Sequence, residues 1–279
     1  MPRQQQKFHD TEAASSPLDM AIVERDRGTI AMVRHALAAG NVALAYQPVI
    51  SCGRGNPVAY YEGLMRLFDD TGRVIPAADF MGAVEDHELG RQIDCAALSI
   101  GLNALKAHPS LRLAINMSAR SIGVPAWMNM IRKCTHLHPE ISERLILEIT
   151  ETSAMQVPEI VAIFMEEMQD KGITFALDDF GAGQTSFRHL KDFCFDILKI
   201  DGQFARNVHD DPDNQVLTEA LLSIARHFDM LAVAEAVETA QDAQWLTHAG
   251  LDCLQGYYFA APSLTPPWKA AGERSMQSG

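Results

Sequence analysis

The feature that most constrains the fold is an alternation of short apolar runs with amphipathic stretches along most of the 279 residues. Two runs joined by a short glycine-containing turn, residues 42–51 and 58–67, predict an antiparallel pair of strands. Beyond this pair a helix precedes each strand. The expected strands are 111–117, 144–149, 173–178, 195–201, 230–235 and 252–256, and the expected helices are 18–39, 77–86, 90–107, 125–135, 158–171, 186–192, 214–228 and 240–249.

Strand–helix alternation implies parallel strands joined by right-handed crossovers. Eight strands in a chain of this length predict an α/β fold, a (β/α)8 TIM-like barrel with one antiparallel strand. The alternative is an open doubly wound sheet, but no GxGxxG motif follows the first strand. We expect one domain over residues 18–264, flanked by disordered segments at 1–17 and 265–279.

Charge and cysteine usage narrow the class of protein. A formal charge of −13 without a basic stripe argues against a nucleic-acid polymer as partner. The five cysteines are scattered and contain no CxxC pair, which is typical of a reduced protein. No run is long enough to span a bilayer, and nothing near the start resembles a signal peptide. We therefore expect a soluble cytoplasmic protein without a membrane partner.

Asp178 and Asp179 directly follow the apolar run 173–177, and Gly181 and Gly183 come next. Neighbouring strand residues point to opposite faces, so we expect the glycines to bend the backbone until both carboxylates reach one point. Two carboxylates at one point repel each other unless a cation lies between them, which predicts a divalent metal. The alternative is a solvated strand-to-helix turn.

In a barrel of this type the chemistry lies at the carboxyl ends of the strands. Nearly every expected strand carries a polar residue there, and the first strand carries one inside it: Gln47, Glu62 with Arg66, Asn116, Glu148 with Glu151, Asp178 with Asp179, Lys199, Glu235 with Glu238, and Gln255. Any one of them could simply be a solvated strand end. Together their oxygens suit Mg²⁺ or Mn²⁺, whereas no Cys/His cluster suits zinc. Two ions ~3.5–4 Å apart would offset the repulsion and clamp a phosphodiester.

These residues belong to motifs that occur in a fixed order. The motifs are Gln47-Pro48-Val49, Glu62-Gly63-Leu64, Asn116, Glu148-Ile-Thr-Glu151, Asp178-Asp179-Phe180-Gly181, Lys199-Ile200-Asp201, Glu235-Ala-Val-Glu238 and Gln255-Gly256-Tyr257. Over residues 28–264 this pattern resembles the EAL-domain cyclic di-GMP phosphodiesterases. The resemblance implies hydrolysis of cyclic di-GMP to linear pGpG in bacterial signalling. It also implies Mg²⁺ or Mn²⁺ as cofactor in two positions, inhibition by Ca²⁺, and a homodimer.

The resemblance also implies a role for each residue. The metal ligands would be Glu62, Asn116, Glu148, Asp178 and Asp179, with Asp178 bridging the two positions. Lys199 would orient or polarise the attacking water, and Glu235, also at the metal–water cluster, would be the candidate base. The substrate would contact Gln47, Leu64, Arg66, Glu238 and Gln255, and Glu151 would brace the loop after Asp179.

The chain departs from the family pattern at a few positions. The departures are Gly63 in place of the usual Ala, Ala236 in place of Gly, Gln184 in place of Tyr, Thr185 in place of Ser, and Ala261 in place of Lys. None of these changes removes a metal ligand, so they bear on turnover and regulation rather than on the chemistry. Three other functions stay open: a catalytically weak EAL domain that acts as a cyclic di-GMP receptor or interaction module, a Schiff-base aldolase using Lys199, and an HD-type phosphohydrolase using His209-Asp210.

Overall fold

The computed structural model describes residues 16–182 and 190–268. Its strands form one sheet in the order β1-β9-β8-β7-β6-β5-β4-β2-β3, and an added pairing between β1 and β2 closes eight of them into a barrel. The strands are β1 Val42–Ser51, β2 Val58–Phe68, β3 Val74–Pro76, β4 Leu113–Asn116, β5 Leu145–Thr150, β6 Thr174–Phe180, β7 Ile197–Ile200, β8 Leu231–Ala234 and β9 Cys253–Leu254.

The direction of β1 matches the prediction from the sequence. β1 runs antiparallel to both of its neighbours, β2 and β9. The remaining barrel strands pair in parallel, from β2 with β4 around to β8 with β9. The predicted closed barrel with one antiparallel strand is therefore confirmed.

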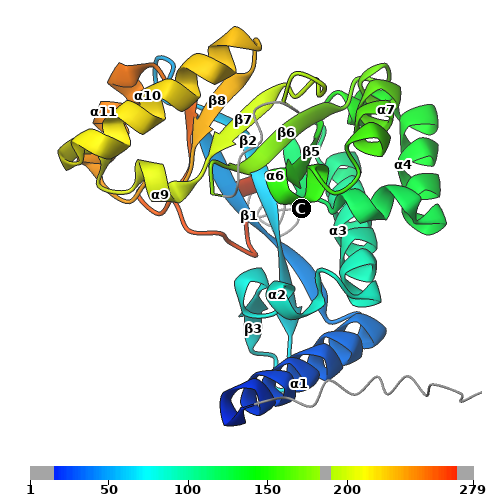
Figure 1. Ribbon diagram of the computed structural model, residues 1–279. Helices are drawn as coiled ribbons and strands as arrows, with labels where there is room; N and C mark the ends of the chain where they lie inside the picture. The colour runs from blue at the N-terminus through cyan, green and yellow to red at the C-terminus, as the bar shows by residue number, and fades with distance from the viewer. Residues whose placement is uncertain (1–15, 183–189, 269–279) are drawn as a thin grey trace, which may run out of the picture.

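Helices cover the outside of the barrel (Figure 1). α3, α4 and α7 lie on one side, and α10 and α11 lie on the other, while α1, α2 and β3 form a lobe beyond the barrel at the far ends of β1 and β2. The helices are α1 Pro17–Ala39, α2 Met81–Val84, α3 Glu88–Ala107, α4 Pro125–Leu137, α5 Pro139–Ser142, α6 Glu151–Ala154, α7 Pro158–Gln169, α9 Gly202–Ala205, α10 Pro212–His227 and α11 Ala240–Ala249, with 3₁₀ turns η1 Ala77–Asp79, η2 Ala119–Gly123 and η3 Val208–Asp210.

Two local expectations were wrong, and a third is only partly covered by the described residues. The chain forms an extra strand, β3, which pairs antiparallel with β2. The helix expected at 77–86 is broken into η1 and α2, because Phe80 between them has a φ of −134° and its ring is buried in the core. Most of the helix expected at 186–192 lies outside the described residues.

The described chain continues past the predicted domain limit at residue 264. The Trp268 ring packs on the barrel, with its centroid 5.1 Å from that of Tyr46 and 4.2 Å from that of Tyr61. Residues 265–268 are thus placed against the barrel, and the rest of the expected tail lies outside the described residues. None of the helices in residues 16–182 and 190–268 has the length and apolar character needed to cross a bilayer.

The barrel interior holds an apolar layer that we call the floor. It consists of one residue from each barrel strand: Val49, Tyr60, Ala114, Ile146, Ala176, Ile197, Val233 and Cys253. The larger apolar core lies between the barrel and its helices and includes Trp127, Phe164 and Phe175. Because side chains alternate along a strand, the residue two positions from each floor residue also faces the interior. The floor therefore fixes which residues form the next layer toward the mouth.

Candidate active site

The layer above the floor is polar on all eight strands, and we call it the polar layer. Its members lie two positions from the floor residues, in the direction of the strand ends: Gln47, Glu62, Asn116, Glu148, Asp178, Lys199, Glu235 and Gln255. In β1 the residue number falls from the floor to the polar layer, from Val49 to Gln47, because that strand is antiparallel to the others. The structure therefore brings these eight predicted site residues into one ring at the barrel mouth.

Lys199 lies at the centre of this ring. Its side chain is 1% exposed, and its ammonium is surrounded by four carboxylates. The distances from Nζ are 2.7 Å to Glu235, 2.9 Å to Glu148, 2.9 Å to Asp178 and 3.5 Å to Glu62. An ammonium has three N–H donors, so four carboxylates cannot all be satisfied by it.

Glu62 is held by two amide side chains. Asn116 Nδ2 donates to one of its oxygens at 2.8 Å, and Gln255 Nε2 donates to the other at 2.7 Å. Gln255 is also 3.2 Å from Gln47 Oε1, and Gln47 Nε2 donates to the carbonyl of Ala260. Four members of the polar layer are thus linked by hydrogen bonds, which fix the orientation of Glu62 before any ligand binds.

The backbone at Asp179 explains how two adjacent carboxylates meet. Asp179 has a φ of +55°, and the register of β6 with β7 shifts between Leu177 and Phe180. The bend therefore begins at Asp179 itself, followed by Gly181 at +94°, and not only at the glycines as expected from the sequence. The N–H of Gly181 donates to Glu151 Oε2 at 3.4 Å, so Glu151 contacts the start of the loop that it was expected to brace.

Burial and crowding change how the charged groups of the site titrate. Burial alone lowers the pKa of Lys199, but the surrounding carboxylates reverse this effect and raise its pKa well above the ordinary value. Burial raises the pKa of Glu148 well above its usual range, and it raises that of Glu235 to about 8. Partial burial and the charge of Asp178 raise the pKa of Asp179 to about 6. The site therefore carries more acidic groups than one lysine can keep ionised.

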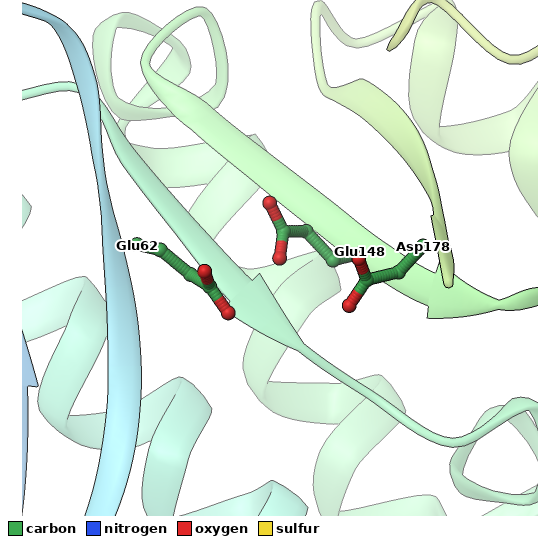
Figure 2. Close-up of side chains that lie close together, drawn as sticks. All are labelled: Glu62, Glu148 and Asp178. Carbon is green, nitrogen blue, oxygen red and sulfur yellow. The ribbon is translucent and has the colours of Figure 1, made fainter. Parts of the chain in front are cut away.

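The acidic groups fit the predicted divalent metals. One oxygen from each of Glu62, Glu148 and Asp178 lies within 4.8 Å of the others, and Figure 2 shows the three side chains close together. A second group with the same spacing contains Asp178, Asp179 and Glu235. Asp178 belongs to both groups. Hard oxygen donors in excess of the local positive charge are the donor set that Mg²⁺ or Mn²⁺ requires.

A cavity of about 440 Å³ opens at the mouth beside this cluster. Four of the predicted substrate-binding residues line it: Gln47, Leu64, Glu238 and Gln255. Arg66 is not one of the lining residues, and its Nη1 donates to the carbonyl of Met65.

Several lining residues were not among the predicted site residues: Asp201, Gln203, Arg206, Ala236 and Tyr257. Asp201, Ala236 and Tyr257 lie inside the motifs noted in the sequence, although no role was assigned to them there. Gln203 in α9 and Arg206 just after it had only one signal, their position four and seven residues beyond Lys199.

The geometry bears on two of the alternative functions. A Schiff-base lysine must lose its proton, but carboxylates hold the Lys199 ammonium charged. His209 contacts Asp242 at 2.7 Å instead of pairing with Asp210 to form an HD site. Asp242 also accepts the hydroxyl of Thr239 at the start of α11, so this contact serves the helix cap. Both alternatives lose their structural basis.

The comparisons with known proteins agree with this geometry. Residues 30–262 match the family described as EAL domain. The chain is 28% identical over 234 residues to the cyclic di-GMP phosphodiesterase PdeB of Shewanella oneidensis, a match that covers 82% of this chain and 27% of PdeB. It is 29% identical over 239 residues to the probable cyclic di-GMP phosphodiesterase PdeG of Escherichia coli, covering 83% of this chain and 46% of PdeG. The chain thus spans less than half the length of these relatives.

A solved structure shows the same architecture. The FimX EAL domain from Pseudomonas aeruginosa, bound to c-di-GMP, superposes with a TM-score of 0.73 at 26% identity. The match covers 85% of this chain and 96% of that domain.

Proposed function

The chain belongs to the EAL domain family, and on that basis we propose that it hydrolyses cyclic di-GMP to linear pGpG with Mg²⁺ or Mn²⁺. The observation that carries the proposal is the polar layer, in which four carboxylates surround one buried lysine and Asp178 belongs to both acidic groups. Related proteins named cyclic di-GMP phosphodiesterases support the substrate.

Metals bound by Glu62, Asn116, Glu148, Asp178 and Asp179 would polarise the phosphodiester and lower the pKa of a water. Lys199 contributes a fixed positive charge, because its neighbours keep it protonated, and this charge stabilises the developing negative charge of the phosphate. Glu235 accepts a proton from the attacking water. Burial raises the pKa of Glu235 above that of an ordinary carboxylate, which makes it a stronger base.

The cavity beside the cluster supports the binding of the rest of the substrate. Four residues in the walls of the cavity hold the nucleotide: Gln47, Leu64, Glu238 and Gln255. Arg66 completes this set through a phosphate oxygen, for which its guanidinium is well suited. Glu151 keeps the loop after Asp179 in place through the N–H of Gly181. A cytoplasmic homodimer is part of the proposal, and light scattering during size-exclusion chromatography tests the dimer.

Product analysis with cyclic di-GMP tests the proposed reaction. We expect pGpG with Mg²⁺ or Mn²⁺, inhibition by Ca²⁺, and no product from Glu62→Ala or Lys199→Ala although both variants retain the circular dichroism spectrum of the wild type. Tight binding of cyclic di-GMP without pGpG would instead identify a receptor. Wild-type turnover by either variant would overturn the assignment of the site.

A further inference from the structure

Tyr60 is the one floor residue with a hydroxyl group, and it lies directly below Glu62 on β2. The floor residues Ala114 and Ala176 are small, which leaves space in the barrel for an aromatic ring. Tyr60 is only 5% exposed. Its ring therefore closes the barrel immediately beneath the polar layer.

Four buried oxygens near this boundary lack hydrogen-bond partners within the described part of the chain, and the Tyr60 hydroxyl is the one donor among them. The acceptors are Glu148 Oε1, Asp178 Oδ1, which lies 2.9 Å from Lys199 Nζ, and Gln255 Oε1. A carboxylate oxygen accepts a stronger hydrogen bond than an amide oxygen does. The other oxygen of Glu148 accepts a hydrogen bond from Lys199 at 2.9 Å. An unsatisfied buried polar group costs about 1–3 kcal/mol, so a donor and an acceptor are not expected to stay unpaired in adjacent layers.

The electrostatics are consistent with this pairing. Burial raises the pKa of Tyr60 well above its ordinary value, and the charge of Glu148 is the next largest cause, ahead of those of Lys199 and Glu62. A phenol O–H is a hydrogen-bond donor, which is what the unpaired oxygen of Glu148 lacks.

We propose that Tyr60 is a positioning residue of the metal site, whose hydroxyl donates to Glu148 Oε1 directly or through one buried water. The hydrogen bond fixes the Glu148 carboxylate from below while Lys199 holds it from the side. A ligand oriented in this way loses less freedom when a cation binds. The inference rests on the proposed function only in taking Glu148 as a metal ligand.

Tyr60→Phe tests the inference, because it removes the hydroxyl and keeps the ring in the floor. Tyr61→Phe is the matched control, since Tyr61 is next in the same strand and faces outward against Trp268. The binding of Mn²⁺ alone is measured by calorimetry without substrate. We expect Tyr60→Phe to weaken Mn²⁺ binding by about 10–100-fold, as for other residues that support metal ligands, and Tyr61→Phe to bind as the wild type does.

Activity measurements separate this inference from the proposed function. We expect Tyr60→Phe to need more Mn²⁺ for half-maximal hydrolysis, with KM for cyclic di-GMP unchanged at saturating Mn²⁺. If neither protein makes pGpG but Tyr60→Phe still binds Mn²⁺ more weakly than the wild type does, the proposed phosphodiesterase activity is overturned. The positioning role of Tyr60 then stays intact.

Three results would overturn the inference. The first is Mn²⁺ binding by Tyr60→Phe within twofold of the wild type, which would mean that the hydroxyl serves the cavity of about 270 Å³ on the other side of the floor. The second is a wild type that binds no Mn²⁺. The third result comes from a crystal structure of the wild type with Mn²⁺, which also decides the question if the variant does not fold. In that result the Tyr60 hydroxyl has neither Glu148 nor a bridging water within hydrogen-bond distance.

Discussion

The δ1 methyl group of Ile115 occupies the space next to Gly63, where a Cβ atom would lie only 3.0 Å from it. Ile115 also fills the space beside Gly101 of α3, where a Cβ would lie 2.7 Å from the same methyl group. One buried isoleucine thus packs against two glycines, which accounts structurally for Gly63 where related domains usually have alanine.

Gly63→Ala is expected to lower the free energy of unfolding by about 1–2 kcal/mol, because the added methyl overpacks a full space. Ile115→Val removes the δ1 methyl and should relieve part of the crowding, since a Cβ at residue 63 would still lie 3.1 Å from Leu44 Cδ1. The double variant is therefore expected to be more stable than the sum of the two single changes predicts, measured by urea denaturation. Simple additivity would show that Ile115 does not determine the tolerance at residue 63.

Ala236 has a φ of +50°, a conformation that is unfavourable for alanine. Ala236→Gly is expected to raise the free energy of unfolding by about 0.5–1 kcal/mol, since relief of this strain outweighs the added freedom of the unfolded chain. Ala234→Gly, two residues earlier in β8, is the control and should be destabilising. Equal losses of stability in both variants would contradict the strain at residue 236.

Lys199→Met keeps a side chain of similar length and removes the positive charge from the centre of the polar layer. Without Mn²⁺ the variant is expected to be less stable than the wild type by about 3–5 kcal/mol, because its buried carboxylates lose their partner. Mn²⁺ should raise its melting temperature by more than that of the wild type, since the ion supplies the missing charge. Hydrolysis should fall by at least about 10²-fold. Differential scanning calorimetry with and without Mn²⁺ measures these changes. Equal increases in the melting temperature of the variant and of the wild type would contradict the prediction.

Asp94 gives a pH dependence that is separate from the metal cluster. It is buried, and its Oδ2 accepts hydrogen bonds from the Ser118 N–H at 2.9 Å and the Ser121 hydroxyl at 2.6 Å. Burial raises its pKa in the folded protein to about 6, from 3.8. The folded state therefore binds the proton more tightly than the unfolded state does. It follows that the contribution of Asp94 is most favourable below the unfolded pKa and decreases as the pH rises to about 6.

Asp94→Asn removes this titration and retains an oxygen that can accept both hydrogen bonds. Relative to the variant, the wild type is expected to lose up to roughly 3 kcal/mol of stability between pH 4 and pH 6 and to change little above pH 6. Urea denaturation at a series of pH values checks this. Parallel stability profiles for the two proteins would contradict the assignment.

The barrel and the composition of its mouth were predictable from the sequence, because both follow from patterns that repeat along the chain. Strand–helix alternation determines parallel pairing, and the alternation of side chains along a strand places Glu62 or Lys199 inside the barrel once the strand is located. The central position of Lys199 was not predictable. It depends on how the eight strands tilt and close, which brings side chains from β2, β5, β6 and β8 to one amine.

Other features depend on tertiary packing that leaves little trace in the sequence. The positive φ of Asp179 had no local signal, because the following glycines account equally well for a bend. The break at Phe80 arises from burial of its ring in the core, which overrides the local helical pattern. Arg206 and Tyr257 reach the cavity from turns, where neither helical nor strand periodicity indicates direction.

The spacing between the floor and the polar layer has a consequence for how this chain can vary. Each polar side chain lies two residues from its floor partner, so deleting the single residue between them would turn that side chain away from the barrel interior. Changes in length within the strands would therefore remove a group from the site even if every functional residue were kept. Insertions and deletions should be tolerated only in the connecting loops. Substitutions at the mouth could alter the chemistry without changing which side chains face the barrel interior.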